Sequence, residues 1–243
     1  MSLAGYGVYG IECIPMAEVL RAKPVNAQVR HRGSFFPPSY NLVTTDVSVL
    51  LAGKLAQTFN LKSTGIIVNQ NAMSTQYLSL RYILPNDPIR YLDASIGVDQ
   101  AEIVFLNPAT VGELKGEVGR VWNAILESLK PNITENYFEA TLHCVTEGLN
   151  VRKFLNDLVN IQLDVPGGHK GISLTTKVAD IDAEAKISLD VSGSVPDGLY
   201  VVFACVSKKN AKDMVSLEHL FEVTINTYRR MQSLAHIELL EPT

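Results

Sequence analysis

The chain has 243 residues, of which 47% are hydrophobic and 19% are charged, and its formal net charge is −4 at pH 7. This composition is typical of a folded globular protein and excludes a disordered, fibrous or strongly basic one. A negative net charge gives no general attraction to nucleic acid or to anionic membranes. No apolar run approaches the roughly 20 residues that cross a bilayer, and no lysine or arginine precedes Arg21 to begin a secretory signal. We therefore expect a cytoplasmic protein without a membrane partner.

Residues 25–130 predict a strand, a helix, several short strands and a long helix, in that order. Apolar and polar residues alternate over residues 25–32, which is the pattern of a half-buried strand. Thr44 or Thr45 can cap the helix that follows. Shorter strands are expected near residues 65–69, 78–84, 92–98 and 101–106.

The long helix of this first half begins after Thr110, which can cap it. Apolar residues recur at helical spacing through its length, at Val111, Leu114, Val118, Val121, Trp122, Ile125 and Leu129. Gly112, Gly116 and Gly119 fall along one narrow face of the same helix. Each glycine inside a helix costs roughly 0.5–1 kcal/mol relative to alanine. We therefore predict close packing of another backbone against this face, either within the chain or at a homodimer seam.

Residues 131–243 repeat the order of elements with one strand fewer. Asn150 can cap the first helix and Ser216 the second. In the turn Val195–Gly198, proline presets φ, and we expect the glycine to adopt the left-handed conformation. Strands are expected near residues 137–144, 172–178, 185–191 and 199–206.

Both halves read β-α-β(3–4)-α, which predicts an α+β fold built by tandem duplication. We expect a curved, mainly antiparallel sheet with the helices packed on one face. The element order is similar to the half-repeat of the TATA-binding-protein fold, and helix-grip and SecB-like sheets fit the same order. The predicted organisation is an N-terminal segment at residues 1–24, a first lobe at 25–130 and a second lobe at 131–243. The two lobes are expected to form one continuous domain.

The polar residues of the alternating strands should point away from the helices and form an open sheet face. The candidate ligand or partner surface comprises Arg30, Arg32, Arg81, Asp93, Tyr137, Glu139, His143, Lys177 and Lys186. Charges of both signs are interspersed in this set, whereas a DNA-binding saddle needs a mainly basic face. The pattern therefore argues against nucleic acid and favours another protein or a second copy of the chain.

Cysteine and histidine positions predict no metal site. Cys13, Cys144 and Cys205 are odd in number, widely spaced and free of any C-x-x-C pair, so we expect buried, reduced thiols. The five histidines, at positions 31, 143, 169, 219 and 236, show no metal-ligand spacing. No cofactor motif occurs, and we predict no cofactor.

Two local features could carry chemistry. The loop residues Gly167, Gly168, His169 and Lys170 could bind an anion through backbone N–H groups. The loop lacks phosphate-loop spacing and runs into a strand, which favours a surface connection. His143 precedes a cysteine, but neighbours on a strand point to opposite faces and cannot act as a nucleophile–base pair. We nominate no catalytic residue.

Three functions remain after these exclusions. The first is a non-catalytic binding or protein-interaction module that acts through its sheet face or its inter-lobe cleft, as a homo-oligomer or with another protein. The alternative is an enzyme or small-ligand receptor with a polar site between the lobes. A second alternative is nucleic-acid binding through Arg30, His31 and Arg32.

Overall fold

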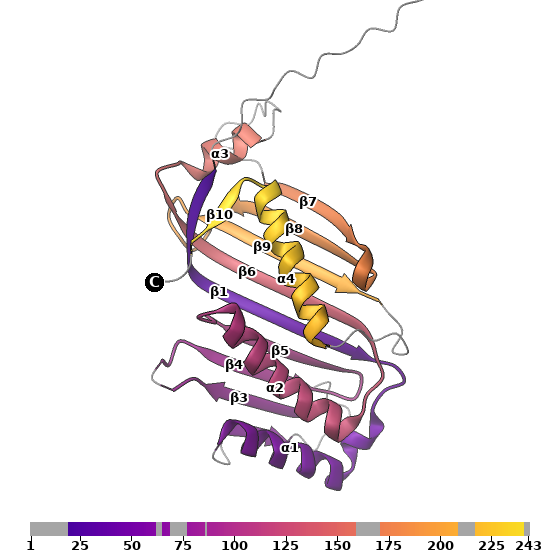
Figure 1. Cartoon of the computed structure of the whole chain (residues 1–243). Helices are drawn as coiled ribbons and strands as arrows, with labels where there is room; N and C mark the ends of the chain where they lie inside the picture. Colours follow the sequence, from indigo (N-terminus) through magenta and orange to yellow (C-terminus); the bar gives the residue numbers. More distant parts are fainter. Residues whose placement is uncertain are drawn as a thin grey trace, which may run out of the picture.

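A computed structural model of the chain describes residues 19–61, 65–68, 77–85, 87–158, 171–208 and 217–240. In these residues it is an α+β protein with four α-helices and one open sheet of ten strands (Figure 1). The first half contains β1 (Leu20–Phe35), α1 (Thr45–Phe59), β2 (Ile66–Val68), β3 (Leu78–Ile83), β4 (Tyr91–Ile96), β5 (Gln100–Leu106) and α2 (Val111–Leu129). The second half contains β6 (Ile133–Glu147), α3 (Val151–Leu158), β7 (Ile172–Val178), β8 (Ala183–Val191), β9 (Leu199–Ser207), α4 (Leu217–Leu234) and β10 (Ile237–Leu239).

The sheet is antiparallel along its main path, in the order β2-β3-β4-β5-β1-β6-β9-β8-β7. The two longest strands, β1 and β6, lie side by side at its centre and pair from Arg21↔Glu147 to Phe35↔Ile133. One strand of this central pair comes from each half of the sequence. The prediction of a large, mainly antiparallel sheet is therefore confirmed.

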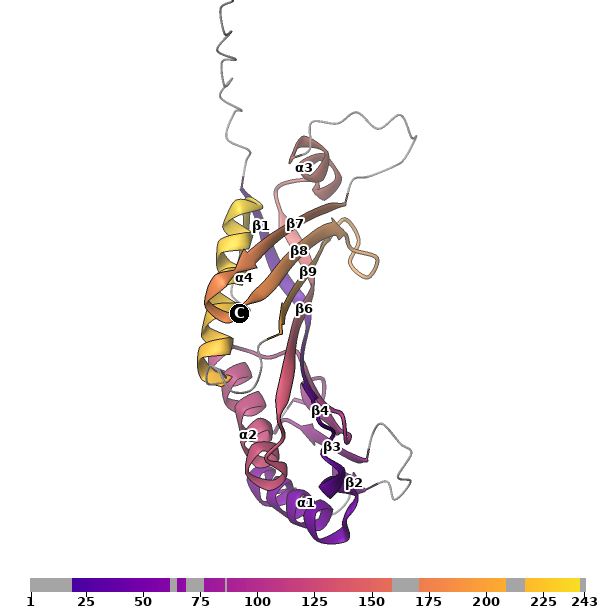
Figure 2. The same ribbon diagram turned by 90° about the vertical axis from the view of Figure 1, so that its right-hand side faces the viewer.

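Helices α1, α2 and α4 lie on one face of the sheet (Figures 1 and 2). Their apolar stripes and the alternate strand residues form the core, in which Phe105, Trp122 and Phe203 are fully buried. Helix α3 differs from the prediction, because it lies at one end of the sheet, away from the other three helices (Figure 2). Among the described helices, none combines the length and apolar composition that a bilayer-spanning helix needs.

The start of α2 is fixed by a reciprocal cap that the sequence predicted in part. The Thr110 hydroxyl accepts a hydrogen bond from the Glu113 N–H at 3.0 Å, and the Glu113 carboxylate accepts one from the Ala109 N–H at 2.6 Å. This arrangement satisfies two backbone donors that a helix terminus leaves free. Arg90 also binds the Glu113 carboxylate and so ties the helix start to the residue just before β4.

Strand β10 is absent from the sequence prediction. It pairs in parallel with the first residues of β1, from Leu20↔Ile237 to Ala22↔Leu239. Leu20 and Ala22 are consequently fully buried, and β1 begins earlier than its alternating pattern indicated. The pairing brings Leu239 to the helix-covered side of the central strands.

Candidate functional site

A cleft of about 500 Å³ lies on the helix side of the sheet, between α2 and α4 and above the central strands. Its floor is formed by Ala27 and Val29 of β1 and by Phe138, Ala140 and Leu142 of β6. These are the alternating apolar positions of the two strands. In Figure 1, β1 and β6 lie in the sheet behind the two helices, at the centre of the sheet.

The floor of the cleft is less completely covered than the neighbouring strands β5 and β9. Val29, Ala140 and Leu142 keep 6%, 8% and 8% of their surface, whereas Phe105 on β5 and Phe203 on β9 keep none. Protein interiors are otherwise filled to crystal-like density. The small side chain of Ala140 leaves room that a larger residue would occupy, so the centre of the sheet is open between the helices.

The walls of the cleft are mainly apolar. Helix α4 contributes Ile225, Tyr228, Arg229 and Gln232. The opposite wall consists of the segment before α2, with Pro108, Ala109 and Thr110, and the start of α2, with Val111, Gly112 and Leu114. Pro24, Leu239 and Leu240 close one side. Arg229 is the one charged residue among the described residues that line the cleft. The site therefore offers apolar contact with a few polar groups, as small-molecule sites commonly do.

Tyr228 is an unusual member of this lining. Its hydroxyl is buried and makes no hydrogen bond with good geometry to any described residue. Burial raises the pKa of this hydroxyl well above its ordinary value, and the Gln232 side chain nearby opposes the rise. The ring packs against Phe203, with centroids 5.1 Å apart. Tyr228 thus holds a neutral, buried hydroxyl that lies beside Gln232 without a hydrogen bond of normal geometry to it.

The predicted open face lies on the opposite side of the sheet, and its central charges pair with one another. Arg30 lies 3.8 Å from Glu102 and 4.0 Å from Glu139, and Arg32 lies 3.8 Å from Glu135. The guanidinium of Arg32 also covers the Tyr137 ring at 5.1 Å.

The Tyr137 hydroxyl donates to Glu139 on the same strand. Burial and this hydrogen bond raise the pKa of Tyr137 to about 12. The tyrosine therefore stays neutral. Because Glu139 also lies beside Arg30, the positive and negative charges at the centre of the face largely balance.

The remaining predicted surface residues lie in separate groups. Arg81 binds Asp93 through two contacts of 2.7 Å, within a groove of about 620 Å³ on β3, β4 and β5. His143 Nδ1 lies 2.9 Å from the Ser192 hydroxyl, on the other half of the sheet. Lys177 and Lys186 are exposed on the outer strands β7 and β8. The nine residues share a face but do not form one site.

The glycine face of α2 does not serve close packing within the described chain, so this part of the prediction is wrong. No described atom lies within 4 Å of where a Cβ would stand on Gly116 or Gly119, and the nearest to Gly112 is the Thr110 hydroxyl at 3.7 Å. The glycines project away from the buried stripe of the helix. A seam with a second copy stays a prediction, and Gly112 lines the cleft instead.

His31 is buried on the helix side of the sheet, not on the predicted nucleic-acid surface. It keeps 1% of its surface and packs between Trp122 and Phe221, each ring centroid 5.2 Å away. His31 follows Val29 by two residues on β1, so the alternating pattern of the strand places both on the same face. The buried position of His31 could therefore have been predicted from the sequence. His31 therefore cannot join Arg30 and Arg32 in contacting a ligand on the open face.

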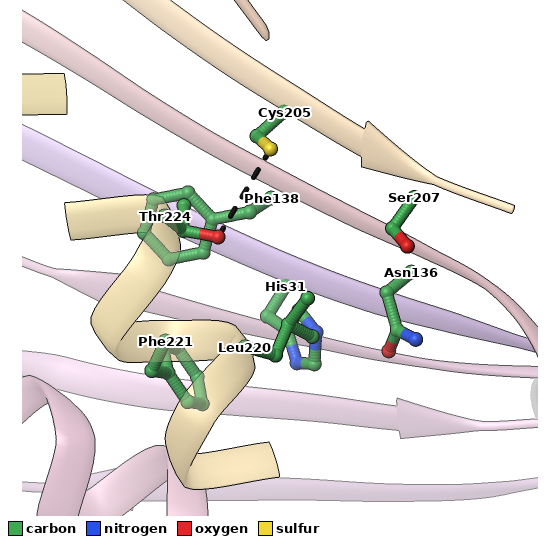
Figure 3. Close-up of a pocket in the computed structure, with 8 residues that line it drawn as sticks. All are labelled: His31, Asn136, Phe138, Cys205, Ser207, Leu220, Phe221 and Thr224. Carbon is green, nitrogen blue, oxygen red and sulfur yellow. Dashed lines mark hydrogen bonds between the residues drawn. The ribbon is translucent and has the colours of Figure 1, made fainter. Parts of the chain in front are cut away.

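A small cavity of about 10 Å³ lies beside His31 (Figure 3). Asn136, Ser207 and Thr224 also line it, and neither His31 nitrogen has a hydrogen-bond partner among the described residues. Burial lowers the pKa of His31 to about 4, and the Asn136 side chain opposes this shift. The space is close to one water molecule, too small for a ligand.

Cys144 and Cys205 are buried and free, as predicted. Burial raises the pKa of Cys144 to about 12 and that of Cys205 to about 11, which makes thiolate chemistry unfavourable. Cys13 and the possible anion loop at residues 167–170 lie outside the described residues. Within the described ranges, no group of three or more His, Cys, Asp or Glu residues could hold a metal ion.

Comparison of the sequence with models of known protein families gives no match, and comparison with curated proteins gives none either.

Proposed function

We propose that the protein is a non-catalytic binding protein that holds an apolar ligand group in the cleft between α2 and α4. The observation that carries this proposal is the mainly apolar cleft above Val29, Ala140 and Leu142. Covering apolar surface that water now reaches is favourable by about 25 cal/mol per Å². The cleft volume also falls within the range of about 300–1,000 Å³ that is common for small-molecule sites.

The polar groups of the cleft support binding over catalysis. Thr110, Tyr228, Arg229 and Gln232 line it, but no carboxylate, histidine or cysteine does among the described lining residues. General acid–base and nucleophilic catalysis draw mostly on those side chains. The lining is therefore suited to orienting a ligand and poorly suited to transforming it.

The charges of the open face support the cleft as the preferred site. Arg30 and Arg32 lie beside glutamates, and Arg81 lies beside Asp93. Binding a phosphate backbone would require these arginines to exchange one anionic partner for another.

We also propose that the fold is a doubled architecture, in which the two lobes form one continuous domain. The first strands of the two halves, β1 and β6, pair at the centre, and the later strands of each half extend outward on either side. This strand order supports the proposal of a doubled architecture. The cleft then lies at the junction of the lobes, between the second helix of each.

The proposed function can be tested with Nile red, an uncharged dye whose fluorescence rises in apolar surroundings. We expect saturable binding to the native protein and a loss of at least tenfold in affinity for Ala140→Phe, because the new ring fills the cleft. Thr141→Phe, on the open face of the same strand, is the matched control. Unchanged dye binding by folded Ala140→Phe would refute the proposal, as would equal losses in both variants.

A further inference from the structure

We propose that the ligand of the cleft is a long-chain carboxylate, with its chain along the central strands and its carboxylate at Arg229. This inference rests on the proposed function and specifies its ligand. The starting point is charge complementarity. Arg229 lines the cleft on α4, and no acidic side chain is found among the described lining residues. A single guanidinium matches a singly charged head and can bind both carboxylate oxygens.

The start of α2 adds positive potential on the opposite wall. Val111 and Gly112 line the cleft in the first turn of the helix, where backbone N–H groups have no partner within the helix. The positive end of the helix dipole favours a negative group nearby. Glu113 is already occupied, because it binds Arg90 and the Ala109 N–H. Glu113 itself does not line the cleft.

Tyr228 gives the second, independent observation. Tyr228 lines the cleft, and its buried hydroxyl, which lies beside Gln232, makes no hydrogen bond of normal geometry in the described part of the chain. A buried hydroxyl that makes no hydrogen bond costs about 1–3 kcal/mol. A carboxylate oxygen, or a water held beside it, would give this donor an acceptor. The free protein thus carries a small cost that ligand binding can remove.

These features divide the cleft into two kinds of surface. The floor of Val29, Phe138, Ala140 and Leu142 presents only carbon, which suits a hydrocarbon chain. Tyr228 and Arg229, on successive residues of α4, present a donor and a cation. A molecule that is apolar throughout would offer no partner to either polar group, whereas an amphiphile with one anionic end would match both surfaces.

The test compares dodecanoate with dodecan-1-ol, which has the same chain and an uncharged head, by displacement of Nile red from the native protein. We expect dodecanoate to bind about tenfold more tightly. Arg229→Gln should remove most of this preference and leave dodecan-1-ol binding unchanged. Arg230→Gln is the matched control, because Arg230 is exposed on the same helix and does not line the cleft.

Tyr228→Phe separates ligand recognition from a purely structural role. We expect the variant to bind dodecanoate several-fold more weakly while its melting temperature in the absence of ligand is unchanged or higher, because an unpaired buried hydroxyl has been removed. A lower melting temperature together with unchanged binding would show that the hydroxyl serves only the fold and would contradict its assigned role.

The outcomes distinguish the two proposals. If neither dodecanoate nor dodecan-1-ol displaces the dye and the dye itself does not bind, the proposed function is wrong. If both bind equally and Arg229→Gln has no effect, apolar binding stands and the carboxylate inference is overturned. Tighter binding of dodecyl phosphate than of dodecanoate would also overturn the carboxylate inference. Self-association of the chain that displaces the dye from the cleft at high protein concentration would overturn it as well.

Discussion

Acidification should destabilise the protein through His31. The imidazole is buried between Trp122 and Phe221, and burial lowers its pKa to about 4 from an ordinary value of 6.5. Above pH 6.5 the ring is neutral in the folded and unfolded chains, so it contributes no pH dependence. Between pH 6.5 and 4 the unfolded chain binds the proton more tightly, and the free energy of unfolding falls as pH falls.

The size of this effect follows from the shift. A change of 2.5 in pKa corresponds to a loss of about 3 kcal/mol in the free energy of unfolding between pH 7 and pH 4, at about 1.4 kcal/mol per pKa unit. This loss is a large part of the free energy of unfolding of a typical domain, which is about 5–15 kcal/mol. The small cavity beside His31 is lined by no charged side chain among the described residues, so the folded protein offers the imidazolium no counter-ion.

Urea denaturation at several pH values, followed by the fluorescence of the single tryptophan, Trp122, would measure the effect. Carboxylates also titrate below pH 5, so the useful quantity is the difference between the native protein and His31→Phe, which keeps an aromatic ring at this position. We expect the variant to lose about 3 kcal/mol less than the native protein between pH 7 and pH 4. A difference between the two proteins that does not change with pH would refute the reasoning.

Three further substitutions have defined expectations for urea denaturation. Gly33→Ala should destabilise the protein by about 1–3 kcal/mol, because its Cβ would lie 2.6 Å from the Trp122 ring; no loss would mean that Trp122 can move. Gly116→Ala should stabilise it by roughly 0.5–1 kcal/mol, because nothing in the described chain approaches that Cβ; a loss accompanied by dissociation of a dimer would instead support the seam. Arg81→Ala should change stability by less than about 1 kcal/mol, because the arginine side chain of this ion pair is 65% exposed; a larger loss would show that the pair is structurally important.

Most elements could be predicted from sequence because their local patterns and their burial agree. Helix α2 has a capping threonine at position 110 and a continuous apolar stripe, and it forms over Val111–Leu129 as expected. Strand β10 could not be found in this way, because three residues carry too little pattern. It exists through its pairing with Leu20, which is a long-range contact.

The turn before β9 shows where local rules gave the wrong residue. The left-handed conformation is adopted by Asp197, with φ of 49°, and not by Gly198. Glycine is needed at position 198 for a different reason, since a Cβ there would lie 2.6 Å from the Cys144 carbonyl oxygen. That contact depends on the neighbouring strand β6, which a sequence pattern does not reveal.

For the candidate site, the sequence predicted only a location between the lobes and not the residues that line it. Ala140 and Leu142 have the pattern of ordinary core residues, and nothing local distinguishes them from Phe105 or Phe203. Their partial exposure arises because α2 and α4 leave the central strands uncovered between them. The missing hydrogen bond of Tyr228 likewise depends on packing and is invisible in the sequence.

The most direct test of the account is nuclear magnetic resonance of alanine methyl groups during titration with dodecanoate. Ala27 and Ala140 lie in the floor of the cleft, whereas Ala94 and Ala185 are buried on the same side of the sheet beyond it. We predict saturable shifts of the Ala27 and Ala140 methyl signals, with Ala94 and Ala185 unchanged. Unmoved Ala27 and Ala140 signals at saturating ligand, or equal shifts of all four, would contradict the assignment of the cleft as the binding site.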